Sequence, residues 1–268
     1  MTASIPSASI PPTFSPGAFT PAPGRGKLGR MLLAQARIET ALALRNGEQV
    51  LLTLLIPLAL LIGLTVLKIV PLSEPRVNEV APRILALAVM SSAFTGQAIA
   101  LGFDRRYGVL KRLAATAIPR WLLGAGRVLA ALSIVAIQVV ILGVVAALLG
   151  WAPAVSGIVW AIVLVLLGTL AFGALGVLLG GALRAEIVLA AANIVWFVLL
   201  LAGGIALPVS SLPGGLGAVV ELLPSGALAE SLHTVLTEGG APGWQPVLVL
   251  IIWAAAAGGV ATRTTRLT

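Results

Sequence analysis

Cysteine is missing from this sequence, and histidine occurs once, at His233. The missing cysteine excludes disulfides and thiolate metal sites, and one histidine cannot supply the histidine pair of a zinc site. No Gly-x4-Gly-Lys-Ser/Thr loop occurs, so the sequence cannot hold nucleotide phosphates by that route. His233 has no serine partner in a facing membrane span, which disfavours an intramembrane protease, and we expect it at a surface or interface.

Charge is also scarce. Charged residues make up 10% of the chain and hydrophobic residues 59%. Soluble domains have about 25% charged and about 45–50% apolar residues, so this composition predicts an all-α membrane protein with several spans. The net charge of +8 would suggest a nucleic-acid partner in a soluble protein. Here orientation in the membrane explains nearly all of it, and we expect no nucleic acid as partner.

Long apolar runs predict six spans, each close to the roughly 20 residues that cross the hydrocarbon core. No span contains Asp, Glu or Lys, which argues against a proton-coupled carrier and for a driving force supplied from outside the chain. Pro57 should kink the first span because its nitrogen donates no hydrogen bond. The expected spans are Gln49–Leu67, Ile84–Gly102, Val128–Gly150, Val155–Gly180, Ile187–Leu207 and Pro246–Thr262.

Basic residues are distributed unequally between the two sides of these spans. Only Lys68, Arg76 and Arg83 fall on one side, and every other Lys and Arg falls on the other. Because Lys and Arg near span ends stay in the cytoplasm, both termini are predicted to be cytoplasmic, in the cell membrane.

The N-terminal region divides into two parts. Residues 1–24 are rich in Pro, Ser, Ala and Thr and have no charge, which predicts a disordered tail. Residues 25–48 are expected to form a cytoplasmic helix, in which Leu28–Arg45 has one apolar and one basic face. That pattern indicates an interfacial helix along the inner leaflet; a plain cytoplasmic extension of the first span is the alternative.

A basic loop, Phe103–Arg127, joins the second and third spans and includes six Lys and Arg residues. Tyr107, Leu110 and Ala114 follow helical spacing, which predicts a short amphipathic helix on the cytoplasmic side. Pro119 should end it and begin the next helix. A helix of this kind is suited to dock into a partner protein.

The outer segment Pro208–Gln245 has no Lys or Arg but shows helical spacing of apolar residues on both sides of Pro224. It predicts two short amphipathic helices, too short to span, that lie in or dip into the outer leaflet. 

Three stretches resemble the membrane permease subunits of type-2 ABC exporters, a family that includes drug exporters and polysaccharide exporters. The first is Asp104–Thr116, similar to the family's Gly-Thr-Leu-Lys-Arg-Leu signature, although Val109 stands where Thr is usual. The second is the Gly204-to-Pro224 run with its Leu-Pro pairs, and the third is the amphipathic helix before a Pro-containing span. Asp104 replaces the commoner Glu, and Ala117 the usual Pro.

The resemblance implies a six-span permease domain over 49–268, working as a dimer with a second copy or a paralogous permease. A separate cytoplasmic ABC ATPase would bind ATP and Mg, so this chain is expected to be a transport subunit rather than an enzyme, with no cofactor of its own. The family's coupling helix maps onto Asp104 to Ala115. The residues expected to contact the ATPase are Asp104, Arg105, Arg106, Tyr107, Gly108, Leu110, Lys111 and Arg112.

In that family the substrate path runs between the second and fifth spans of the two protomers, and five residues here are candidates for it. Gln97 is the sharpest, because an unpaired amide in lipid is costly. Helix packing is the alternative role for these residues. The candidates are Ser92, Thr95 and Gln97 in the second span and Asn193 and Trp196 in the fifth.

The leading interpretation is an ATP-driven exporter permease for a hydrophobic, amphipathic or lipid-linked compound. The alternative is a six-span scaffold or sensor that recruits a partner or anionic membrane lipids through its basic loop.

Overall fold

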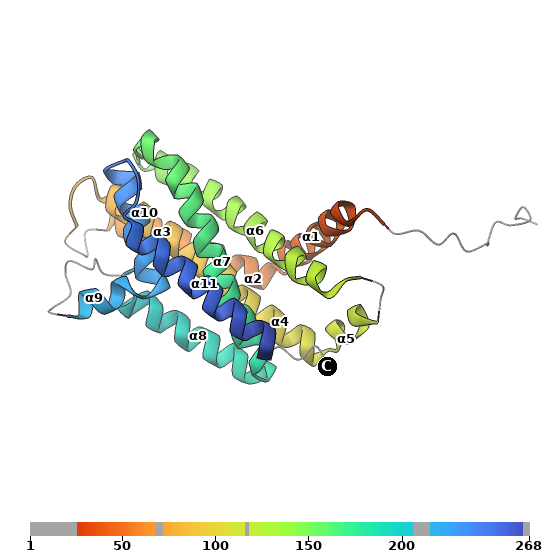
Figure 1. Ribbon diagram of the computed structural model, residues 1–268. Helices are drawn as coiled ribbons and strands as arrows, with labels where there is room; N and C mark the ends of the chain where they lie inside the picture. The colour runs from red at the N-terminus through yellow and green to blue at the C-terminus, as the bar shows by residue number, and fades with distance from the viewer. Residues whose placement is uncertain (1–25, 68–71, 116–117, 206–214, 265–268) are drawn as a thin grey trace, which may run out of the picture.

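The computed structural model describes residues 26–67, 72–115, 118–205 and 215–264, and in these ranges every regular element is a helix (Figure 1). The predicted tail, residues 1–24, and the prolines Pro208 and Pro213 lie outside the described residues. The elements in chain order are α1 (Leu28–Arg45), α2 (Gly47–Val66), α3 (Arg76–Met90), the π-helical η1 (Ser91–Gly96), α4 (Gln97–Arg106), α5 (Val109–Ala114), α6 (Arg120–Leu148), the 3-10 turn η2 (Val155–Gly157), α7 (Ile158–Ala182), α8 (Ala185–Ala202), α9 (Leu216–Glu221), α10 (Pro224–Thr237) and α11 (Trp244–Thr264).

Four helical segments of the described chain are long and apolar enough to cross a membrane, and two apolar helices are shorter. Each of the six segments overlaps one of the six expected spans, and the all-α membrane architecture is confirmed. The long segments are Arg76–Arg106, Trp121–Leu148, Val155–Ala182 and Trp244–Arg263, and the shorter ones are Thr53–Val66 and Ala185–Leu201.

The segment Arg76–Arg106, made of α3, η1 and α4, is the centre of the bundle. In its most apolar window 78% of the residues are buried, against 22–33% in the other three long segments. It is also 31 residues long, and it begins eight residues before the expected start at Ile84. A helix with neighbours on nearly all sides can accept polar groups that lipid would exclude.

The early start of this segment corrects the prediction that Arg76 and Arg83 lie in an outer loop. Both are in α3, with exposed fractions of 6% and 7%. Nη2 of Arg76 donates hydrogen bonds to the carbonyl oxygens of Leu64, in the last turn of α2, at 3.0 Å and of Leu67, just after α2, at 3.2 Å. A buried arginine is tolerated when its donors are satisfied in this way.

Helix α7 packs against the central segment through two glycines. A Cβ on Gly176 would come 2.6 Å from the carbonyl oxygen of Phe94, and one on Gly180 would come 2.5 Å from that of Ala98. Any side chain larger than hydrogen would push the helices apart, so the Gly176-x3-Gly180 pair serves helix packing.

Helices α9 and α10 confirm that two short helices precede the last span, and α10 is surrounded by other helices of the protein. It packs between α3, α7 and α11, and Ser225 and Leu228 are fully buried. A Cβ on Gly157 would come 1.7 Å from the carbonyl oxygen of Val235, so the turn before α7 touches the backbone of α10. The apolar residues of α10 face protein because this helix completes the hydrophobic core between α3, α7 and α11.

Helix α1 spans the predicted residues Leu28–Arg45 and packs along α6. Ala36 is buried there, and a Cβ on Gly126 would come 2.5 Å from Cγ of Gln35. Figure 1 shows α1, α5 and the C-terminal end of α11 at one end of the bundle and α9 at the other. The interfacial placement of α1, and the division into 1–24, 25–48 and 49–268, remain predictions.

Candidate functional site

The basic segment between the second and third spans folds differently from the single helix expected over Asp104–Ala115. Asp104 to Arg106 form the last turn of α4, and the chain breaks at Tyr107 and Gly108 before α5 begins. Gly108 has φ +67°, in the left-handed region that only glycine adopts readily. Nothing in the protomer lies within 4 Å of a Cβ built there, so within this chain the glycine is required by the turn and not by packing.

The last turn of α4 is attached to three other helices. Asp104 forms an ion pair with Arg127 of α6, and Arg106 forms one with Glu186 at the start of α8. Nη1 of Arg105 donates hydrogen bonds to the carbonyl oxygens of Gly180 at 3.0 Å and Leu183 at 3.1 Å, at the end of α7. Asp104 therefore does not belong to the short helix expected here, because that helix, α5, starts only after Gly108.

Fewer of the predicted ATPase-contacting residues are exposed than expected. Tyr107 is 66% exposed and stacks on Phe103, with ring centroids 6.1 Å apart. Lys111 and Arg112 are exposed, whereas Leu110 is 8% exposed and packs inside the protomer. Leu110 is thus not available to fill a partner's groove, and Tyr107, Lys111 and Arg112 form the outward surface.

Ser92 of η1 belongs to a buried polar chain that joins three helices. Its hydroxyl donates to Oε1 of Gln138 in α6 at 2.6 Å. Nε2 of Gln138 in turn lies 3.3 Å from both the carbonyl oxygen and Oγ1 of Thr53 in α2, and donates to them. The sequence analysis missed Gln138, although an amide in the middle of an apolar span was a usable signal.

The two fifth-span candidates are separated by the fold. Trp196 is 9% exposed, and its indole nitrogen donates to Oγ of Ser91 at 2.9 Å. Asn193 lies on the exposed face of α8. One packs inside the protomer and the other faces outward, so they do not form a pair.

The second-span candidates also differ. Oγ1 of Thr95 is buried with no hydrogen-bond partner among the described residues. Gln97 lines a hollow together with Ser92, and Thr95 is not among its lining residues. The structure therefore groups Ser92 and Gln97 and leaves Thr95 outside that group.

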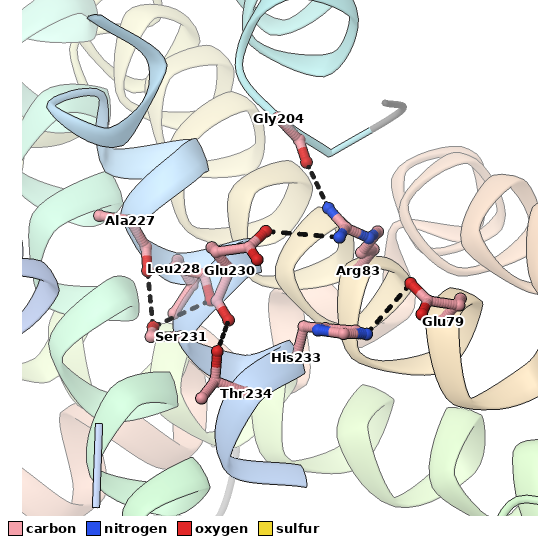
Figure 2. A network of polar contacts seen from close by, with 9 residues as sticks. All are labelled: Glu79, Arg83, Gly204, Ala227, Leu228, Glu230, Ser231, His233 and Thr234. Carbon is pink, nitrogen blue, oxygen red and sulfur yellow. Dashed lines mark hydrogen bonds and ion pairs between the residues drawn. The ribbon is translucent and has the colours of Figure 1, made fainter. Parts of the chain in front are cut away.

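A second polar network ties α10 to α3, and Figure 2 shows its members facing one another across the two helices. Arg83 lies 3.3 Å from Glu230 and donates to the carbonyl oxygen of Gly204 at 3.0 Å. His233 is 15% exposed at its side chain, with Nε2 3.1 Å from Oε2 of Glu79. His233 thus lies at a helix interface, with an acidic partner that the sequence analysis did not assign.

Within the described residues no group of three or more His, Asp and Glu could hold a metal ion. The described residues of this site do not form an arrangement typical of a hydrolase. Instead, an exposed basic segment at one end of the bundle is joined to several membrane helices. The family model for ABC-2 type transporters matches residues 30–236. The chain belongs to the ABC-2 type transporter family. No curated protein matched the chain.

As an ABC-2 membrane domain, the chain is a multi-pass membrane protein and the permease subunit of a transporter. ABC-2 permeases work with ABC ATPase subunits, and this sequence contributes transport and not ATP hydrolysis. The match covers the helices from α1 to α10, including the basic segment and the buried polar chain, and ends before α11.

Proposed function

We propose that this ABC-2 permease exports a hydrophobic, amphipathic or lipid-linked compound, and that a separate ABC ATPase drives it through the segment from Tyr107 to Arg112. The observation that supports the proposal is the attachment of the last turn of α4 to α6, α7 and α8 at the base of this exposed segment. A force applied to Tyr107, the residue directly after α4, therefore reaches three membrane helices within one helical turn.

The proposal includes six spans with both ends in the cytoplasm. Helix α2 has 20 residues and α8 has 18, close to the roughly 20 that cross the hydrocarbon core. Helices α1 and α5 and the end of α11 share one end of the bundle (Figure 1). This is the arrangement expected when basic segments stay on the cytoplasmic side.

The protein would work with a second permease copy or a paralogue. Apolar side chains on the outer face of α8, such as Ile194 at 63% and Phe197 at 55% exposed, are free to contact lipid or another protomer. Asn193 lies on the same face, where contact with protein, water or cargo would relieve the cost of an amide in lipid.

The test is purification of the tagged chain from its native host after gentle crosslinking. A separate ABC ATPase should co-purify, and Tyr107→Ala should lower its recovery at least severalfold, because the exposed ring is a main contact. Trp244→Ala is the matched control, since Trp244 is 77% exposed at the other end of the bundle. Recovery of the intact chain with no ATPase would favour a membrane scaffold instead.

A further inference from the structure

A hollow of about 310 Å³ lies inside the protomer, between the α1–α2 junction, the central segment and α6. Its volume is at the lower end of the roughly 300–1,000 Å³ typical of small-molecule sites. On the central segment its lining extends from Ser92 to Asp104. Those twelve steps at 1.5 Å rise correspond to about 18 Å, which is more than half of the roughly 30 Å thickness of a hydrocarbon core.

One side of the hollow is aliphatic, with Ile99, Ala130 and Ile134 among its lining residues. The deep end is polar, where Ser92 and Thr53 are joined through Gln138. Gln97 also lines the hollow, and its side-chain amide makes no hydrogen bond with any described residue. A partly buried amide with unused donors and acceptor favours a ligand that can hydrogen-bond to it.

The backbone at the deep end is unusual. Residues Ser91–Gly96 form a π-helical stretch within an otherwise α-helical segment. Such widened turns are rare and occur frequently at functional sites. The π-helical stretch includes Ser92, which lines the hollow. It is a second observation, separate from the polar side chains, that indicates a site here.

The cytoplasmic end of the hollow is acidic overall. Asp104 is paired with Arg127, which leaves Glu39 as the uncompensated charge among the described lining residues. Oε1 of Glu39 accepts a hydrogen bond from Gln35 at 3.0 Å, and Oε2 has no partner within the described residues. An ammonium group is the complementary ligand for a carboxylate at the membrane surface.

We infer that this hollow receives cargo from the inner leaflet, and that the cargo is an amphiphilic amine. Its ammonium group would lie at Glu39, its apolar body against Ile99, Ala130 and Ile134, and a polar substituent near Gln97. The inference rests on the proposed transport function, and it places cargo entry within one protomer rather than between two.

The experiment measures ligand binding by the permease alone in lipid nanodiscs, without any ATPase. A negative result would therefore count against the cargo site and not against coupling to the ATPase. The probes are a photoreactive dodecylamine and a photoreactive dodecanoate. The amine should label α2, the central segment and α6 at the hollow, at least several times more strongly than the dodecanoate does. Equal labelling by the two probes, or labelling of the outer face of α8 only, would overturn the inference.

Three variants sharpen the test, each checked for an unchanged melting temperature. Glu39→Gln should weaken amine binding about tenfold, because a charge-assisted hydrogen bond is lost. Ala130→Trp should abolish labelling because the larger side chain fills the hollow. Gln97→Leu keeps the size of the native side chain but removes its amide, and it tests the site if the tryptophan variant does not fold. Glu221→Gln, at the far end of the bundle, is the control. Unchanged binding in Glu39→Gln and in Gln97→Leu would refute the site.

Discussion

Arg105 of α4 donates from Nη1 to the carbonyl oxygen of Gly180, 3.0 Å away, at the C-terminal end of α7. The same nitrogen donates to Leu183 at 3.1 Å. The last carbonyls of a helix lack partners within it and have partial negative charge, so a cation there is favourable. In this permease the cation comes from a second helix, which ties the central segment to α7 next to the proposed coupling surface.

Replacing Arg105 by Met should lower the free energy of unfolding by about 2–3 kcal/mol, since hydrogen bonds to a charged group contribute roughly 1.5–3 kcal/mol and the carbonyls lose their donor. Thermal unfolding of the purified permease is the measurement. Arg112→Met is the matched control, because Arg112 is exposed and should change stability by less than about 0.5 kcal/mol. Equal losses in both variants would show that Arg105 does not hold α7.

Gly108 should tolerate Asn better than Leu. A left-handed conformation costs most residues about 1–2 kcal/mol, but Asn adopts it more readily. We therefore expect Gly108→Leu to abolish ATPase stimulation by the permease and Gly108→Asn to retain most of it, with insertion unchanged in both. Complete loss with Asn as well would mean that close approach of the ATPase, and not the turn, requires glycine.

Ser92 and Gln138 should be energetically coupled. Ser92→Ala leaves the Gln138 carbonyl buried without its donor, at a cost of about 1–3 kcal/mol. Gln138→Leu should cost a similar amount, but the double variant should cost less than the sum by about 1–2 kcal/mol, because both changes remove one contact. Chemical denaturation of all four proteins measures this, and additive losses would contradict the hydrogen bond.

The absence of native cysteine makes the topology simple to test. Thr237, at the exposed end of α10, should react from outside intact cells with an impermeant maleimide once replaced by cysteine, and Ala115, exposed after α5, should not. Ala115→Cys should react fully after permeabilisation, which controls for access. Labelling of position 115 in intact cells would invert the proposed orientation.

Several features of the fold follow from local chemistry and were predictable. Apolar runs of about twenty residues located the membrane helices, and the alternating faces of Leu28–Arg45 located α1 with its observed bounds. Pro119 precedes the first residue of α6, as its missing N–H and fixed φ suggest. Ser92 and Gln97, two of the substrate-path candidates, line the same hollow, and their contact with substrate stays a prediction.

Sequence alone determined the membrane class, the helices and the basic segment, because periodicity, length and charge act within a few turns of chain. Tertiary structure decided which polar residues meet. The sequence placed Arg83 in a loop and Asp104 among the ATPase contacts, whereas helix packing pairs Arg83 with Glu230 of α10 and Asp104 with Arg127 of α6. These partners are 147 and 23 residues apart, and no local pattern specifies a contact between side chains that only helix packing brings together.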